Sequence, residues 1–134
     1  MPEQPTILIC DDEPHILHVV GLKLREAGYG VLTASSGKEC LHLARQHQPV
    51  LLITDYVMPG MNGIEVCRAL REDPVTAEID LILLTARGGS LSDSDIDDTG
   101  FAAIFSKPFS PRELLAFVKE RVAIARVSNS EGDE

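Results

Sequence analysis

The sequence predicts a doubly wound α/β fold, in which a five-stranded parallel sheet carries helices on both faces. Five short apolar runs alternate with amphipathic stretches along the chain. Three of these runs (TILIC, VLLIT and LILLT) are apolar almost throughout, which is typical of strands covered on both sides. Because crossovers between parallel strands are right-handed, this alternation leaves room for one sheet and little else.

The first half of the chain alternates strand and helix. Thr6–Cys10 is a continuous apolar run and predicts the first strand. Ile16–Ala27 has apolar residues at helical spacing and is followed by Gly28, a residue type favoured just past helix ends. Tyr29–Ala34 predicts the second strand, and Lys38–Gln46 the second helix.

The second half repeats the pattern. Val50–Thr54 and Leu81–Thr85 predict buried strands, and Ile64–Glu72 predicts a helix between them. Ala102–Ser106 predicts the fifth strand. Before it, Gly88–Gly100 is rich in Ser, Asp and Gly, so we expect a short or frayed helix that is mobile or becomes ordered only with a partner.

The last helix has the clearest start signal. Ser110 and Glu113 have the spacing of a capping box, and Pro111 occupies the first helical position. The domain is expected to span residues 5–127, followed by an acidic, disordered tail at 128–134.

Composition excludes several classes of protein. The 134 residues carry a formal net charge of −9, which argues against binding to nucleic acid or anionic membranes. No apolar stretch has the length of a transmembrane span, and no secretory signal is present, so a cytoplasmic location is expected. The three cysteines have no CxxC spacing and are interpreted as reduced core thiols.

Polar residues gather where the predicted strands end. Asp11 and Asp12 follow the first strand, Asp55 follows the third, Thr85 ends the fourth and Lys107 follows the fifth. In a doubly wound sheet these carboxyl ends form the ligand-binding edge. Three carboxylates and one ammonium give −3 + 1 = −2 at that edge, which a divalent ion would balance. An all-oxygen ligand set with few protein groups suits Mg²⁺.

This edge also has the groups that phosphoryl transfer needs. Asp55, at the end of the central third strand, is the expected nucleophile. Mg²⁺, Lys107 and the Thr85 hydroxyl would stabilise the charge that spreads over the phosphoryl oxygens in the transition state. The expected product is an aspartyl phosphate.

Four segments in this order, ILICDDEP, LLITDYVMPGMNG, LILLTA and IFSKPF, resemble the receiver domains of two-component response regulators. The resemblance covers residues 6 to 125. It implies a flavodoxin-like sheet with strand order 2-1-3-4-5. It also implies that Asp12 and Asp55 bind Mg²⁺ directly, that Asp11 acts through water, and that the carbonyl of Val57 is a further ligand.

By the same resemblance, Asp55 is the phosphoacceptor and Thr85 and Lys107 contact the phosphoryl oxygens. The bond from Lys107 to Pro108 is expected to be cis, aiming the amine over the site. The implied protein is a switch rather than a turnover enzyme. It would take its phosphoryl group from a sensor histidine kinase or a phosphotransfer domain, and act on an unidentified downstream protein as a monomer or a phosphorylation-dependent dimer.

One position and one segment depart from the family pattern. The segment is the polar Gly88–Gly100, which by the resemblance holds the fourth helix. Ile104 stands where the family usually has Tyr or Phe, so coupling through an aromatic rotamer is in doubt. The neighbouring Phe105 should face the core, because successive strand residues point to opposite faces. By the resemblance, Val57 and Arg87 flank the site at positions that govern how easily water attacks the phosphoryl group. Val57 offers no hydrogen bond to orient a water molecule, which predicts slow self-dephosphorylation.

Other interpretations stay open. The chain could be a receiver-like interaction protein that is never phosphorylated, for which Ile104 is mild support. It could instead be an aspartyl-phosphate phosphohydrolase, although Val57 stands where such enzymes usually have a second acid. His15 and His18, three residues apart, could ligate a metal, while Glu13 adds only a general acidity.

Overall fold

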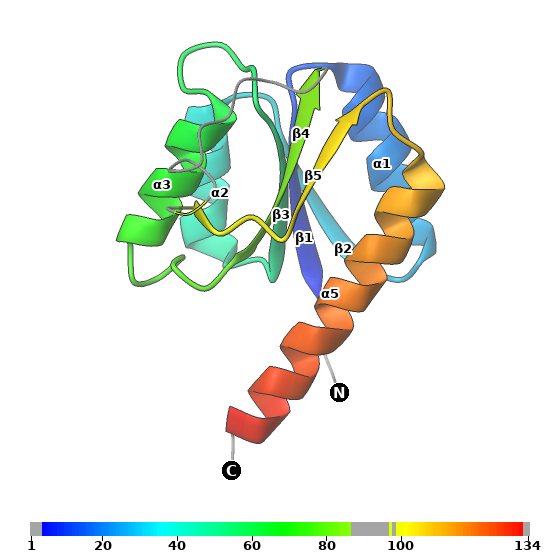
Figure 1. Cartoon of the computed structure of the whole chain (residues 1–134), viewed down its shortest axis with the longest axis vertical. Coiled ribbons are helices and arrows are strands. Elements are labelled where there is room, and N and C mark those ends of the chain that lie inside the picture. Colours follow the sequence, from blue (N-terminus) through cyan, green and yellow to red (C-terminus); the bar gives the residue numbers. More distant parts are fainter. Residues whose placement is uncertain (1–3, 87–96, 98, 133–134) are drawn as a thin grey trace.

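The sheet has the predicted architecture. The computed structural model describes residues 4–86, 97 and 99–132, with side chains described up to residue 124. Five parallel strands lie in the order β2-β1-β3-β4-β5 (Figure 1). The predicted strand order and the doubly wound α/β fold are therefore confirmed.

The strands lie within one or two residues of their predicted positions. Two polar residues expected just beyond a strand are instead its last members, because Asp55 pairs with Leu84 and Lys107 pairs with Ala86 in the ladders. The strands are β1 (Thr6–Cys10), β2 (Gly30–Ala34), β3 (Leu51–Asp55), β4 (Asp80–Ala86) and β5 (Ala103–Lys107).

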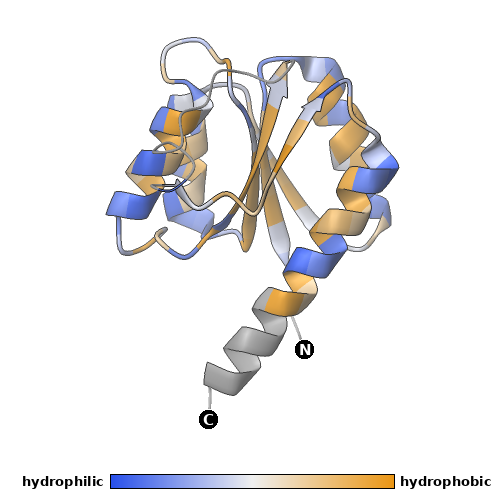
Figure 2. Ribbon diagram, viewed as in Figure 1, coloured by the Kyte–Doolittle hydropathy of each residue, from blue (hydrophilic) through white to orange (hydrophobic). Residues whose placement is uncertain are grey.

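Helices cover both faces of the sheet, as expected from the apolar strands. They are α1 (Pro14–Glu26), α2 (Gly37–His47), α3 (Gly63–Glu72) and α5 (Pro111–Gly132). α2 and α3 lie on one face, and α1 and α5 lie on the other (Figure 1). Apolar residues concentrate in the strands and on the inner helix surfaces (Figure 2).

Alternate residues of β1, β3 and β4 pack into two separate cores, one on each face of the sheet. In β1, Leu8 and Cys10 pack with α2 and α3, whereas Ile7 and Ile9 pack with α1 and α5. Cys10 shares its core with the other two cysteines, and all three are free and buried, as predicted. Two packed cores hold the central strands between them, so the carboxyl ends of β1, β3 and β4 are fixed relative to one another.

α1 ends where the sequence predicts. Gly28 has a φ of +98°, a conformation that favours glycine. The amides of Gly28 and Tyr29 donate to the carbonyls of Arg25 and Leu24, which is the Schellman pattern of a helix C-terminus.

Side chains cap the starts of α2, α3 and α5. At the start of α2, the Ser36 hydroxyl accepts a hydrogen bond from the Glu39 amide. Ser110 accepts a hydrogen bond from the Glu113 amide at the start of α5, as the capping spacing predicts. α3 has a full capping box between Asn62 and Glu65, which the prediction of a helix at Ile64–Glu72 did not include. The Asn62-x-x-Glu65 spacing was the available signal.

Some predictions fall outside what the structure describes. Most of Gly88–Gly100, expected to be mobile, and Arg87 lie outside the described residues. The backbone of α5 continues to Gly132, so helix occupies positions where a disordered tail was expected, and the domain boundary at 127 stays a prediction. Within the described part of the chain, no helix is long and apolar enough to cross a membrane.

Candidate functional site

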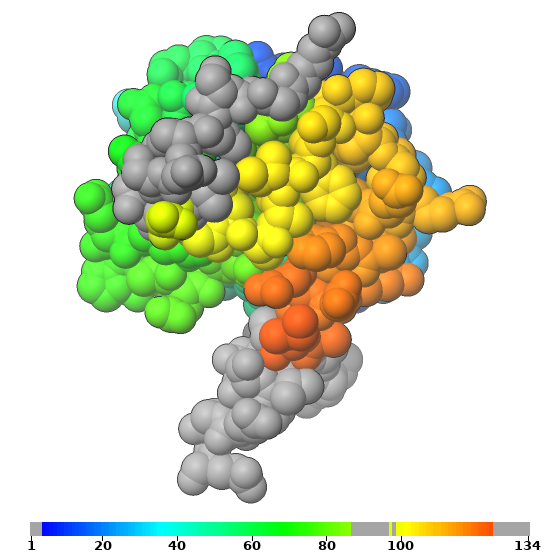
Figure 3. All heavy atoms as spheres, viewed as in Figure 1, coloured from blue at the N-terminus to red at the C-terminus, as the bar shows by residue number. Residues whose placement is uncertain are grey.

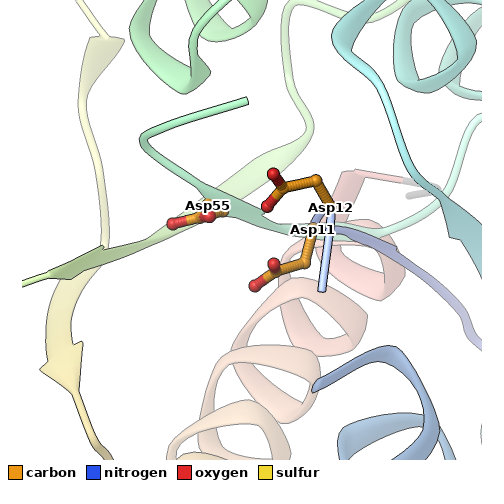
Figure 4. Close-up of side chains that lie close together, drawn as sticks. All are labelled: Asp11, Asp12 and Asp55. Carbon is orange, nitrogen blue, oxygen red and sulfur yellow. The ribbon is translucent and has the colours of Figure 1, made fainter. Parts of the chain in front are cut away.

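Three carboxylates meet at the carboxyl ends of β1 and β3. Asp11, Asp12 and Asp55 each place an oxygen within 4.8 Å of the others (Figure 4). β1 and β3 are adjacent and parallel, which brings the residues that end them to the same edge. Asp11 is fully buried and Asp55 is 5% exposed, whereas Asp12 is open to solvent. The predicted acidic cluster is therefore present.

Lys107, the last residue of β5, is the cation of this cluster. Its Nζ lies 2.9 Å from Asp11 Oδ2 and 3.3 Å from Asp55 Oδ2. It also lies 2.9 Å from Glu13 Oε1. One ammonium thus contacts three carboxylates. When Asp12 is added, four carboxylates and one ammonium give a formal charge of −4 + 1 = −3 at this edge. The peptide bond from Lys107 to Pro108 is cis, as expected.

Glu13 is the member that sequence analysis missed. It is 94 residues from Lys107, and no local spacing in the sequence predicts the contact. Its backbone amide donates to Asp11 Oδ1 at 2.9 Å, while its side chain reaches Lys107. The one feature of the sequence that could have drawn attention to Glu13 is its place at the N-cap of α1, where Ser, Thr, Asp and Asn are favoured.

Two buried oxygens at this edge lack hydrogen-bond partners. Thr85 Oγ1 accepts and donates none among the described residues, although Thr85 is 1% exposed. Asp11 Oδ2 contacts Lys107 as an ion pair, but the contact lacks the angles of a hydrogen bond. A buried polar atom without a partner is costly, so the Thr85 oxygen fits a site that binds a further group.

The carboxylates destabilise one another's ionised forms. Burial, and next the charge of Asp11, raises the pKa of Asp55 from 3.8 to about 6. Burial also raises the pKa of Asp11. Burial alone would lower the pKa of Lys107, but the close contacts with the Asp11 and Glu13 carboxylates and the charge of Asp55 raise it, so the ammonium stays charged.

The acidic cluster fits Mg²⁺. Asp11, Asp12 and Asp55 offer hard oxygen ligands, and the excess negative charge at this edge favours a divalent cation. Val57 lies two residues beyond β3 with its side chain 66% exposed, and its carbonyl as a ligand stays a prediction. Within the described residues, His15 and His18 do not join any group of three metal-ligating side chains.

The backbone after Asp55 is held by a close approach of α3. The Gly63 amide donates to the carbonyl of Tyr56 at 2.7 Å. A Cβ atom added at Gly63 would overlap the carbonyl oxygen of Asp55 and lie 3.1 Å from the Cα atom of Tyr56. Only glycine lets the start of α3 pack this closely against the end of β3.

The strand residues beside Lys107 face as predicted. Ile104 is 40% exposed on β5, which lies open at the surface in Figure 3. Phe105 packs against the α1–α5 core, with its ring centroid 5.9 Å from that of Phe117 in an edge-to-face arrangement. Phe105 therefore does not take the place of the missing surface aromatic residue.

Comparisons with known proteins agree with this geometry. Residues 7–119 match the model of the response regulator receiver domain family. The phosphate regulon transcriptional regulatory protein PhoB of Pseudomonas aeruginosa is 38% identical over 114 residues, covering 85% of this chain and 50% of that protein. The chain thus spans about half the length of the curated relatives it matches.

Solved structures of response regulators also resemble this chain. The chemotaxis response regulator CheY4 of Vibrio cholerae is 28% identical, with a TM-score of 0.80, covering 89% of this chain and 99% of that one. A CheY-like receiver domain protein from Methanospirillum hungatei is 25% identical, with a TM-score of 0.86, covering 94% and 99%.

Proposed function

Because the chain belongs to the family of response regulator receiver domains, we propose that it is a signalling switch that accepts a phosphoryl group on Asp55 with the help of Mg²⁺. One observation carries the proposal. A nearly buried carboxylate, Asp55, lies 3.3 Å from the Lys107 ammonium, and Asp11 and Asp12 lie close enough to hold a cation beside it.

The proposed step is an in-line transfer. A carboxylate oxygen of Asp55 forms a bond to phosphorus, and the bond from phosphorus to the donor atom breaks, with the electron pair leaving on the donor. Lys107 and the Thr85 hydroxyl would contact the phosphoryl oxygens, which would give Thr85 Oγ1 the partner it lacks. Bound Mg²⁺, held by Asp11, Asp12, Asp55 and the Val57 carbonyl, would neutralise charge on those oxygens.

The phosphodonor is proposed to be a sensor histidine kinase or a phosphotransfer domain, and the output a changed protein-binding surface rather than turnover of a substrate. The net charge of −9 makes direct binding of this segment to DNA unfavourable. The proposed location is the cytoplasm, and the three free cysteines fit a reducing compartment.

Intact-mass measurement after incubation with acetyl phosphate tests the proposal. We expect the mass of one phosphoryl group to be added with Mg²⁺, and none with EDTA or in Asp55→Asn. If the wild type gains no phosphoryl group, or if Asp55→Asn gains one equally, the proposal is wrong. A wild type that stays unmodified would favour an interaction protein that is not controlled by phosphorylation.

Val57 is expected to prolong the phosphorylated state. Val57 lies two residues beyond Asp55, and its exposed side chain has no polar atom to orient an attacking water molecule. Val57→Asn should therefore shorten the lifetime of the phosphorylated protein several-fold, measured by intact mass after the acetyl phosphate is removed. Val57→Leu, which adds no hydrogen-bonding group, should keep the wild-type lifetime. Equal lifetimes for all three proteins would contradict this role.

A further inference from the structure

Glu13 forms a contact that its position in the helix does not explain. It is the N-cap residue of α1, yet its side chain makes no capping hydrogen bond. Its carboxylate instead lies 2.9 Å from Lys107 Nζ, although the side chain is 58% exposed and could be solvated freely. An exposed carboxylate held by a cation at the candidate phosphorylation site indicates a role at that site.

The contact holds Lys107 on the α1 side of the site. Lys107 Nζ is 2.9 Å from both Glu13 and Asp11, but 3.3 Å from Asp55. Asp11 is buried and further held by the Glu13 amide, so it is a fixed partner. Glu13 is the partner whose side chain water can solvate. A phosphoryl group on Asp55 would bring additional negative charge and acceptor oxygens to the same ammonium.

We propose that Glu13 is a positioning residue that holds Lys107 until the phosphoryl group on Asp55 displaces it; we call this contact the Glu13 latch. The inference rests on the proposed function. Phosphorylation moves Lys107 towards Asp55 and releases the Glu13 carboxylate. Lys107 thereby couples the phosphoryl group to the start of α1 without an aromatic residue at position 104.

The released carboxylate lies where a change of charge alters the surface. Glu13 and Lys107 both line a pocket of about 470 Å³, together with Ile16, Val19, Pro108 and Phe109. While Glu13 and Lys107 are paired, their opposite charges cancel, so the two residues add no net charge to the pocket. Once Lys107 turns to the phosphoryl group, Glu13 leaves a free negative charge at the rim of a mainly apolar pocket. The phosphorylated and unphosphorylated proteins then differ at this face.

Two substitutions separate the latch from a general effect of charge. Glu13→Gln removes the charge and the ion pair, whereas Glu13→Asp keeps the charge but is one methylene shorter and loses the 2.9 Å contact. Both variants should be phosphorylated by acetyl phosphate about two- to fivefold faster than the wild type at saturating Mg²⁺, the range expected for loss of an exposed ion pair. Glu26→Gln, which removes an exposed carboxylate at the other end of α1, should keep the wild-type rate.

A second measurement reads the contact itself. In metal-free, unphosphorylated protein, the Lys107 ammonium should exchange hydrogen with water more slowly in the wild type than in either Glu13 variant, measured by NMR. In the phosphorylated wild type, the carboxyl ¹³C signal of Glu13 should move towards that of a solvated glutamate. A role in folding alone would move neither the phosphorylation rate nor this signal.

The outcomes are distinct. An acceleration in Glu13→Gln but not in Glu13→Asp would show an effect of charge and overturn the latch, as would wild-type rates in both variants or an unmoved Glu13 signal on phosphorylation. In these cases phosphorylation of the wild type on Asp55 would still support the proposed function. A wild type that takes no phosphoryl group would overturn both proposals.

Discussion

Asp55→Asn is expected to be more stable than the wild type by about 3 kcal/mol at pH 7.5 without divalent ions, and about equally stable near pH 4. In the folded protein the pKa of Asp55 is raised from 3.8 to about 6, because its carboxylate is buried beside Asp11. The folded state therefore binds the Asp55 proton more tightly than the unfolded state does. A shift of about two units corresponds to about 3 kcal/mol.

The sign follows from this difference in proton binding. Below the unfolded pKa, Asp55 is protonated in both states and has no effect on stability. As the pH rises towards the folded pKa, the unfolded state ionises first, and the wild type loses stability until the pH exceeds about 6. Asparagine does not ionise, so the variant avoids this loss.

Urea unfolding in EDTA at pH 4 and pH 7.5 measures the effect. Glu26→Gln, at an exposed position on α1, should differ from the wild type by less than about 0.5 kcal/mol at both values. Saturating Mg²⁺ at pH 7.5 should stabilise the wild type more than Asp55→Asn, because the variant has lost a ligand. A variant less stable than the wild type at pH 7.5 without metal would show that the acids at this edge do not strain the fold.

The residues at the strand ends could be predicted, because the residue types along a short segment are enough to show where a strand ends. Continuous apolar runs mark the buried strands, and the parallel arrangement brings the residues that follow them to one edge, so Asp11, Asp55, Thr85 and Lys107 were expected together. The inward direction of Phe105 followed from the two-residue period of a strand. These predictions need only secondary structure and topology.

The remaining features depend on distances between elements, which no local pattern sets. The Glu13–Lys107 contact joins residues that are 94 positions apart, and it depends on how the start of α1 sits against the end of β5. The unpartnered Thr85 oxygen and the raised pKa of Asp55 depend on burial in the folded chain. The tight packing at Gly63 depends on the approach of α3 to β3, which no pattern in the sequence predicts.

Gly63→Ala should therefore destabilise the protein and impair phosphorylation together. The new methyl group would overlap the carbonyl oxygen of Asp55, which is backbone and has little freedom to move. Overpacking of this kind costs about 1–3 kcal/mol. Relief of the overlap requires a shift of α3 or of the strand end, and a shift of the strand end would displace Asp55 from Lys107, so phosphorylation by acetyl phosphate should slow more than tenfold.

Gly21→Ala is the matched control, because the same methyl group enters a helix interior without a close clash. Its nearest neighbours would be the flexible end of Arg25 at 3.4 Å and a Val31 methyl group at 3.8 Å. Alanine is the better helix former, so this variant should gain about 0.5–1 kcal/mol and keep the wild-type phosphorylation rate. Urea unfolding and intact mass measure both effects. If Gly63→Ala had the stability and the phosphorylation rate of the wild type, the start of α3 would not constrain the position of Asp55, and this prediction would be wrong.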